Sequence, residues 1–133
     1  NQIDYSVQVS RLKALAGRYR PQTIVAETNS IGEPLIEQLR ADGLPVQGFT
    51  TTSQSKQQVI DGLALAFERG ELKILNDQVL IGELQAYEST RLPGGGFRYS
   101  APEGMHDDTV MSLALAYYGT QTGRVEFMPS LYR

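Results

Sequence analysis

The stretch "TIVAETNSIGEPLIEQLRADGLPVQGF", residues 23–49, decides the fold because its apolar residues change spacing twice. Residues 23–28 form a short β-branched run with apolar residues on both sides of the alternation, which is typical of a parallel strand covered on both faces. Residues 31–39 have helical spacing, and Gly43 follows them as a C-terminal cap. Residues 44–49 again have the length of a strand. A strand, a helix and a strand joined by short links predict an α/β fold with parallel strands.

Helices are predicted on both sides of this stretch. Residues 6–19 repeat apolar side chains with a helical period, and Pro21 stops the helix. Residues 51–70 begin with hydroxyl side chains suited to capping, at Thr52 or Ser53, and continue as an apolar helical pattern. Helices flanking parallel strands are the usual arrangement of an α/β layer fold.

The second half of the chain predicts a different order of elements. Residues 71–75 read as a short strand or an extended link, and Asp77 can cap a fourth helix behind it. Two polar-aromatic arms around a glycine turn predict a hairpin over residues 89–102. A last helix follows in residues 104–119. We therefore expect one domain over the whole chain, with a core of about residues 5–119 and a tail of residues 120–133.

Composition excludes several classes of protein. The chain has 133 residues, 41% of them hydrophobic and 20% charged, which is typical of a globular and not a disordered protein. It has no cysteine, which excludes disulfide scaffolds, thiolate zinc sites and a cysteine nucleophile and fits a reducing compartment. No apolar run reaches the roughly 18 residues of a membrane span. The net charge of −3 counts against a basic nucleic-acid binder but not against an enzyme that meets phosphate through a bound cation.

Glu27 is the first candidate functional residue, because it ends the most apolar strand of the chain. A buried carboxylate needs a partner, since its charged form is unfavourable in a low dielectric, and α/β folds place their sites at strand ends. The alternative is that the strand has already reached solvent at Glu27. Asn29 follows in the turn, where it either adds a ligand or shapes the turn.

Asp107 and Asp108 are the second candidates, and they stand at the start of the last predicted helix. Asp107 lies one turn before the apolar residues Val110 and Met111, and Asp108 is rotated from it by about 100°. Asp107 is therefore predicted at the edge of the packed face. The alternative is that both acids are capping or first-turn residues favoured by the helix dipole. His106 is either a supporting polar residue or a capping and packing residue.

Lys56, with the hydroxyls of Thr52 and Ser55, lies at the start of the helix that follows the second strand. Hydroxyls, helix N–H groups and a lysine suit a phosphate, and the alternative is a capped helix with a solvated lysine. The chain has no GxxxxGK[ST] element, which excludes an ATP-binding P-loop. Clustered carboxylates need a compensating cation, and Mg²⁺ or Mn²⁺ takes such oxygen ligands. A third acid is expected for this chemistry, and Asp4 is the only one before Glu27.

Three segments in this order, "RYRPQTIVAETNSIGEPLIEQL", "GFTTTSQSKQQVIDGL" and "YSAPEGMHDDTVMSLALAYYG", resemble the C-terminal nuclease domain of the large terminase subunit of tailed phages. The resemblance covers about residues 5–119. It implies a ribonuclease-H-like fold, a mixed sheet flanked by helices. It also implies a DNA endonuclease that cuts concatemeric viral DNA during packaging and uses divalent cations, Mg²⁺ or Mn²⁺, held by acidic residues.

The resemblance also implies roles for particular residues and partners. Glu27 corresponds to the acid of the second strand, Asp107 and Asp108 to the acids of the final helix, and Lys56 to a lysine close to the site or the DNA. The implied partners are double-stranded DNA, the terminase ATPase domain, the portal and the small subunit. The implied location is the cytoplasm of the host cell.

One feature of that family has no counterpart in this sequence. Family members begin the fold with a strand that carries an aspartate, and this chain starts at the helix behind it. We therefore expect an N-terminally truncated version of the fold, whose open sheet edge is covered by self-association or by a partner segment. Two alternatives stay open: a catalytically incomplete assembly or DNA-binding fragment of the terminase, and another ribonuclease-H-like nuclease such as a junction resolvase.

Overall fold

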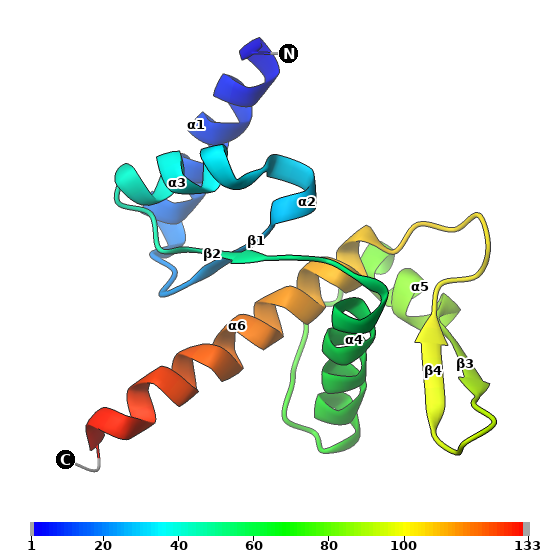
Figure 1. Cartoon of the computed structure of the whole chain (residues 1–133). Coiled ribbons are helices and arrows are strands. Elements are labelled where there is room, and N and C mark those ends of the chain that lie inside the picture. The colour runs from blue at the N-terminus through cyan, green and yellow to red at the C-terminus, as the bar shows by residue number, and fades with distance from the viewer. Residues whose placement is uncertain (1, 132–133) are drawn as a thin grey trace. The chain divides into compact units, whose positions relative to one another are not determined.

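The structure is a computed structural model that describes residues 2–131. The chain divides into two compact units. The first runs to Thr50 and also takes in the chain from Val125 onward, and the second is Thr51–Arg124. That the chain forms one domain remains a prediction. The chain contains both helices and strands, as expected for an α/β fold (Figure 1).

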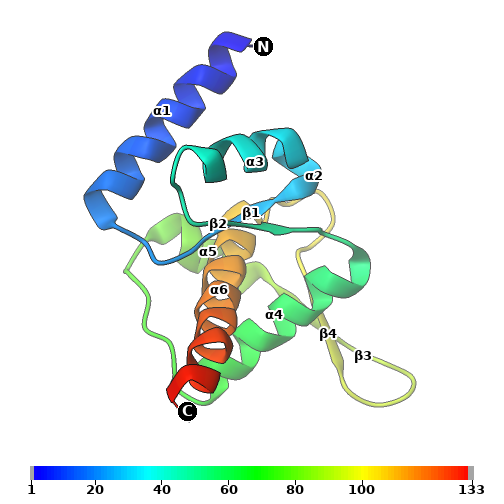
Figure 2. The ribbon, with the colours of Figure 1, turned by 60° about the vertical axis from the view of Figure 1, so that its left-hand side comes forward.

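The first unit contains the strand–helix–strand arrangement that the sequence predicts. Its elements in chain order are α1 (Gln2–Tyr19), β1 (Ile24–Glu27), α2 (Thr28–Ile31), α3 (Glu33–Ala41) and β2 (Val46–Phe49). The strands β1 and β2 pair in parallel, with Ile24 opposite Val46 and Glu27 opposite Phe49. The helix α3 lies along one face of the strand pair (Figure 2). The predicted parallel pairing is confirmed.

The core of the first unit is formed by the apolar face of α3 and the first residue of β2. Ile36 and Leu39 of α3 and Val46 of β2 are buried. Val9 and Leu12 of α1 pack against them. The helix predicted here is confirmed, although it begins at Gln2, before the predicted start. Only the first half of its apolar stripe reaches the core, because Leu15 and Tyr19 are exposed.

One predicted helix is divided in the structure. Residues 31–39 were expected to be continuous, but Gly32 separates α2 from α3. Gly32 has a φ of +79°, a left-handed conformation that glycine adopts without a Cβ clash. Its amide donates to the carbonyl of Thr28, which ends α2 after one turn, and Pro34 then falls in the first turn of α3.

The second unit contains three helices and a hairpin. Its elements are α4 (Ser53–Glu68), α5 (Gln78–Ala86), β3 (Glu88–Arg91), β4 (Phe97–Ser100) and the part of α6 (Asp108–Leu131) before Val125. The hairpin is antiparallel and separate from the β1–β2 sheet. Between α4 and α5 the structure has no strand over residues 71–75, so the extended-link alternative describes them. Helical backbone also continues from Gly119 to Leu131, into residues predicted as a tail.

Helix caps in the second unit follow the sequence closely. The Thr52 side chain accepts from the amide of Ser55, and the Ser55 side chain accepts from the amide of Thr52, which is a capping box at the start of α4. Asp77 accepts from the amide of Leu80 at the start of α5, 2.9 Å away.

The core of the second unit is formed by the apolar faces of α4 and α6. Its buried residues are Val59, Ile60, Leu63 and Ala66 of α4 and Val110, Met111, Ala114 and Leu115 of α6. In the described part of the chain, no helix has the length and hydropathy needed to cross a membrane.

Candidate functional site

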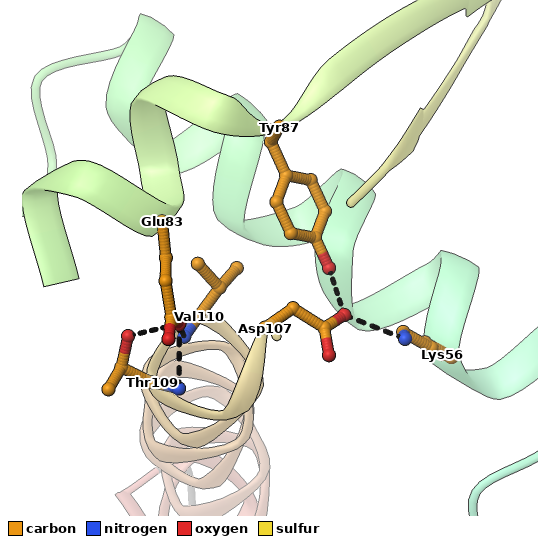
Figure 3. Close-up of polar contacts among 6 residues, drawn as sticks. All are labelled: Lys56, Glu83, Tyr87, Asp107, Thr109 and Val110. Carbon is orange, nitrogen blue, oxygen red and sulfur yellow. Dashed lines mark hydrogen bonds and ion pairs between the residues drawn. The ribbon is translucent and has the colours of Figure 1, made fainter. Parts of the chain in front are cut away.

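The start of α6 is capped by a residue from another helix. The Oε2 atom of Glu83, on α5, accepts from the backbone amides of Thr109 at 3.0 Å and Val110 at 3.3 Å, and from the Thr109 hydroxyl (Figure 3). The first turn of any helix leaves amide groups without an intrahelical partner. Glu83 supplies that partner for two of these amides, and its negative charge suits the helix N-terminus.

The carboxylate of Asp107 points elsewhere, although Asp107 stands at the position of a helix cap. Its carbonyl accepts the first helical hydrogen bond from Met111 at 2.9 Å. Its side chain instead extends toward α4 and the end of α5, where Oδ2 accepts from Lys56 Nζ at 2.8 Å and from the Tyr87 hydroxyl at 2.6 Å (Figure 3). The Asp107 side chain therefore binds residues outside α6 and does not cap that helix.

The surroundings of Asp107 keep its carboxylate charged. Burial alone raises the pKa of Asp107, but hydrogen bonds from Lys56 and Tyr87 and the charge of Lys56 outweigh it, so the pKa lies below its usual value. Burial, and then the hydrogen bond to Asp107, raise the pKa of Tyr87. At neutral pH Tyr87 is therefore a phenol that donates, and Asp107 is an anion available to a cation.

Lys56 has a more specific position than the solvated-lysine alternative suggests. Its ammonium forms an ion pair with Asp107, and 42% of its side chain is still exposed to solvent. Lys56 is therefore neither buried nor a lysine that contacts only solvent. The hydroxyls of Thr52 and Ser55 are engaged in the capping box at the start of the same helix.

Asp108 and His106, the neighbours of Asp107 in the predicted site, lie at the surface. Asp108 is the first residue of α6 and is exposed, where its charge suits the helix dipole. His106 is exposed in the loop that precedes α6. Asp107 is thus the only one of these three whose side chain is partly buried, as its predicted place at the edge of the packed face requires.

Glu27 and Asn29 belong to the first unit. Glu27 is the last residue of β1, is partly buried, and stands before α2 without capping it through its side chain. Asn29 is exposed in α2. The next residue after Glu27 is fixed against the neighbouring strand, since the Thr28 hydroxyl lies 3.0 Å from that of Thr50. Glu27 therefore ends its strand where the sequence predicts, but the predicted turn after it is the short helix α2.

The aspartates at the start of α6 carry the type of donor atom, carboxylate oxygen, that a hard divalent cation binds. Asp107 and Asp108 offer carboxylate oxygens, which Mg²⁺ and Mn²⁺ prefer, and the charged state of Asp107 favours a cation. Among the residues that the structure describes, no three histidine or acidic side chains gather into a ready metal-binding group. The described residues therefore do not show a complete donor set for a metal ion.

Glu83 and Tyr87 are functional candidates that the sequence analysis missed. Glu83 lies on α5, and Tyr87, four residues later, directly follows the end of that helix. The sequence does not reveal their partners, because these are far away along the chain. The contacts of Glu83 with Thr109 and Val110 span 26 and 27 residues, and the contact of Tyr87 with Asp107 spans 20 residues.

Comparison with known proteins agrees with the resemblance. The sequence matches the family described as "Terminase RNaseH-like domain" over residues 1–118. The large terminase subunits of Thermus phage G20c and Thermus virus P23-45 are each 39% identical over 118 residues. Those residues are 88% of this chain and 24% of each relative, so the chain spans about a quarter of their length.

Solved nuclease domains agree in fold as well as in sequence. The large terminase nuclease of phage G20c superposes with a TM-score of 0.68 at 38% identity, covering 86% of this chain and 61% of that one. The same nuclease with bound magnesium has the same score and identity over 84% and 59% of the two chains. The nuclease domain of Thermus phage P74-26 also scores 0.68, at 38% identity, over 85% and 58%. The G20c nuclease is also known with bound cobalt and with bound zinc.

The ribonuclease-H-like fold expected from the sequence is confirmed by these matches. With its matching motifs, its fold and its relatives in agreement, the chain belongs to the terminase ribonuclease-H-like family, the C-terminal nuclease domain of phage large terminase subunits.

Proposed function

We propose that this chain is a divalent-metal-dependent DNA endonuclease domain that cuts concatemeric viral DNA during packaging. The observation that carries the proposal is the charged, partly buried Asp107, held by Lys56 and Tyr87 at the start of α6. Related nuclease domains with bound magnesium, cobalt and zinc support a divalent cation as the cofactor. For this chain we propose Mg²⁺ or Mn²⁺.

Glu27 and Asp107 are the proposed metal ligands, and Asp108 is a further ligand or orients the others. All three offer the oxygen donors that suit such a cation. A divalent cation bound there would lower the pKa of a water molecule and stabilise the leaving oxygen of a phosphodiester. Asn29 and His106 are proposed only as supporting residues, since both are exposed.

Lys56 is the proposed contact to the DNA phosphate, with Thr52 and Ser55 shaping the helix start beside it. Its ammonium balances the charge of Asp107 at a distance of 2.8 Å and remains partly exposed. A phosphate oxygen brought to this place would meet that ammonium and the amide groups at the start of α4. Such contacts position the DNA backbone and carry no sequence information directly.

The proposed partners follow from the family. They are double-stranded DNA, the terminase ATPase domain, the portal and the small subunit, in the cytoplasm of the host cell. The matched relatives are large terminase subunits of which this chain spans 24%, so their remaining length accommodates other domains of the same machine. Self-association of the chain is a further proposal.

A plasmid-nicking assay tests the proposed activity. The chain should convert supercoiled plasmid to nicked and linear forms when Mn²⁺ or Mg²⁺ is added, and EDTA should stop the reaction. Asp107→Asn and Glu27→Gln should each lower the rate by roughly 100-fold or more, since each removes a proposed charged ligand. Asp61→Asn is the matched control, because Asp61 is exposed on α4 and bonds only to Gln57 among the contacts seen.

The same assay distinguishes the second candidate function, a catalytically incomplete assembly or DNA-binding fragment. The absence of a group of three acidic or histidine side chains in the described residues favours this candidate. It predicts DNA binding in a gel-shift experiment with no nicking by any variant. Nicking that survives Asp107→Asn would contradict both candidate functions, because the first requires the Asp107 carboxylate and the second predicts no nicking by any variant.

A further inference from the structure

We propose that Glu83 and Tyr87 are positioning residues: Glu83 takes over the cap of α6, and Tyr87 holds the Asp107 carboxylate that this cap leaves available to the metal. The inference rests on the proposed function, because it assigns Asp107 to the metal. It adds Glu83 of α5 and Tyr87, which directly follows α5, and neither the sequence motifs nor the family resemblance single them out. Its basis is a competition for the same two amide groups.

An aspartate at the position before a helix normally turns its side chain back onto that helix. It accepts from the amide of the second or third helical residue. In α6, which begins at Asp108, these residues are Thr109 and Val110. Glu83 accepts from both of them, at 3.0 and 3.3 Å. The donors that would draw the Asp107 side chain into a cap are therefore already satisfied.

Tyr87 then fixes where the Asp107 carboxylate goes. Its hydroxyl and the Lys56 ammonium both meet the same oxygen, Oδ2, while the other oxygen points away from both donors (Figure 3). A carboxylate held by one oxygen presents the second to a cation in a defined direction. Hydrogen bonds of this kind to metal ligands orient them and raise metal affinity.

Tyr87 is partly buried. It lines an apolar groove of about 380 Å³ together with Ile60 and Leu63 of α4 and Val110 of α6. Removal of the hydroxyl alone, in Tyr87→Phe, keeps this packing and isolates the hydrogen bond to Asp107.

Mn²⁺ titration of the whole chain by calorimetry tests the role of Tyr87 and Glu83. Tyr87→Phe and Glu83→Ala should each weaken Mn²⁺ affinity by roughly 10-fold, the usual effect of removing an outer partner of a metal ligand. Glu83→Gln keeps an oxygen that accepts from Thr109 and Val110, so it should restore most of the affinity. Unchanged affinity in Tyr87→Phe and Glu83→Ala would overturn the proposal.

Tyr117→Phe is the matched control for the loss of a tyrosine hydroxyl. Tyr117 also donates to a carboxylate, that of Glu71 at 3.1 Å, within the same unit. Neither residue bonds to Asp107 among the contacts seen. Tyr117→Phe should therefore leave Mn²⁺ affinity unchanged, and an equal loss in both variants would mean that the Tyr87 effect is a general loss of stability.

A second measurement needs no metal. In urea unfolding with EDTA, Glu83→Ala should lower the midpoint more in an Asp107→Ala background than in the wild-type chain, because Asp107 can then no longer replace the lost cap. Additive effects would overturn the competition. If wild-type chain binds no Mn²⁺, the proposed metal site fails, and this cycle alone decides whether Glu83 displaces Asp107 from the cap.

Discussion

Asp107 has three features, each of which suggests a different role for its side chain. It stands where a helix cap stands, it carries the charge that a metal ligand needs, and it lies at the edge of a packed face. The contacts of its side chain exclude one of these roles, the cap: Lys56 and Tyr87 bind the carboxylate, and Glu83 caps the helix. A residue type and a position at a helix start were not enough to separate a ligand from a cap.

The ion pair between Lys56 and Asp107 predicts a dependence of stability on pH. The pKa of Asp107 is below its unfolded value of 3.8, so its contribution is complete above that pH and is lost as the pH falls through the folded pKa. Lys56→Met removes the main cation. The wild-type chain should therefore lose more unfolding free energy than Lys56→Met between about pH 7 and pH 3, by about 0.5–1 kcal/mol because the pair is partly exposed.

Urea unfolding at the two pH values checks this prediction. Asp42 also has a lowered pKa because it pairs with Lys13, but that pair is present in both chains and cancels in the comparison. An equal loss of unfolding free energy in wild type and Lys56→Met would contradict the prediction. It would mean that Tyr87 and not Lys56 sets the pKa of Asp107.

At the scale of elements, local patterns predicted the structure where a few neighbouring residues decide it. The parallel strands, the capping box of α4, the Asp77 cap of α5 and the hairpin all follow from short-range rules. The break at Gly32 was missed because an apolar helical period continues across it. The cap of α6 was missed because its partner, Glu83, is 26 residues away from Thr109.

Substitution by alanine should have opposite effects on stability at two of the glycines, Gly48 and Gly62. A Cβ on Gly48 of β2 would lie 2.9 Å from Cγ2 of Thr28, which is too close without a shift of one of them. Gly48→Ala should therefore destabilise the chain by about 1–3 kcal/mol. Gly62, inside α4, has nothing within 4 Å of that position, so Gly62→Ala should stabilise by about 0.5–1 kcal/mol.

Urea unfolding of these two variants measures both signs in one experiment. Because Thr28 follows Glu27 directly, Gly48→Ala should also weaken plasmid nicking if Glu27 is a ligand. Gly62→Ala is the control for Gly48→Ala, because both variants add one methyl group. A destabilising Gly62→Ala together with a neutral Gly48→Ala would contradict the close approach of β2 to Thr28.

At the scale of the whole molecule, the small sheet of the first unit predicts association. In the part of the chain that the structure describes, β1 and β2 are each other's only strand partners. An outer strand edge is a template for pairing with a further strand. The chain should therefore show a concentration-dependent increase in sedimentation coefficient. A single monomeric species at every concentration would contradict self-association.

The central claim is that Asp107 belongs to a metal site of a nuclease. The most direct test is calorimetric titration of Mn²⁺ into the wild-type chain, Asp107→Asn and the control Asp61→Asn. The account predicts saturable binding to wild type and Asp61→Asn, and a loss of affinity of roughly 10-fold or more in Asp107→Asn, which keeps the shape but not the charge. Equal Mn²⁺ affinity in Asp107→Asn and wild type would contradict it.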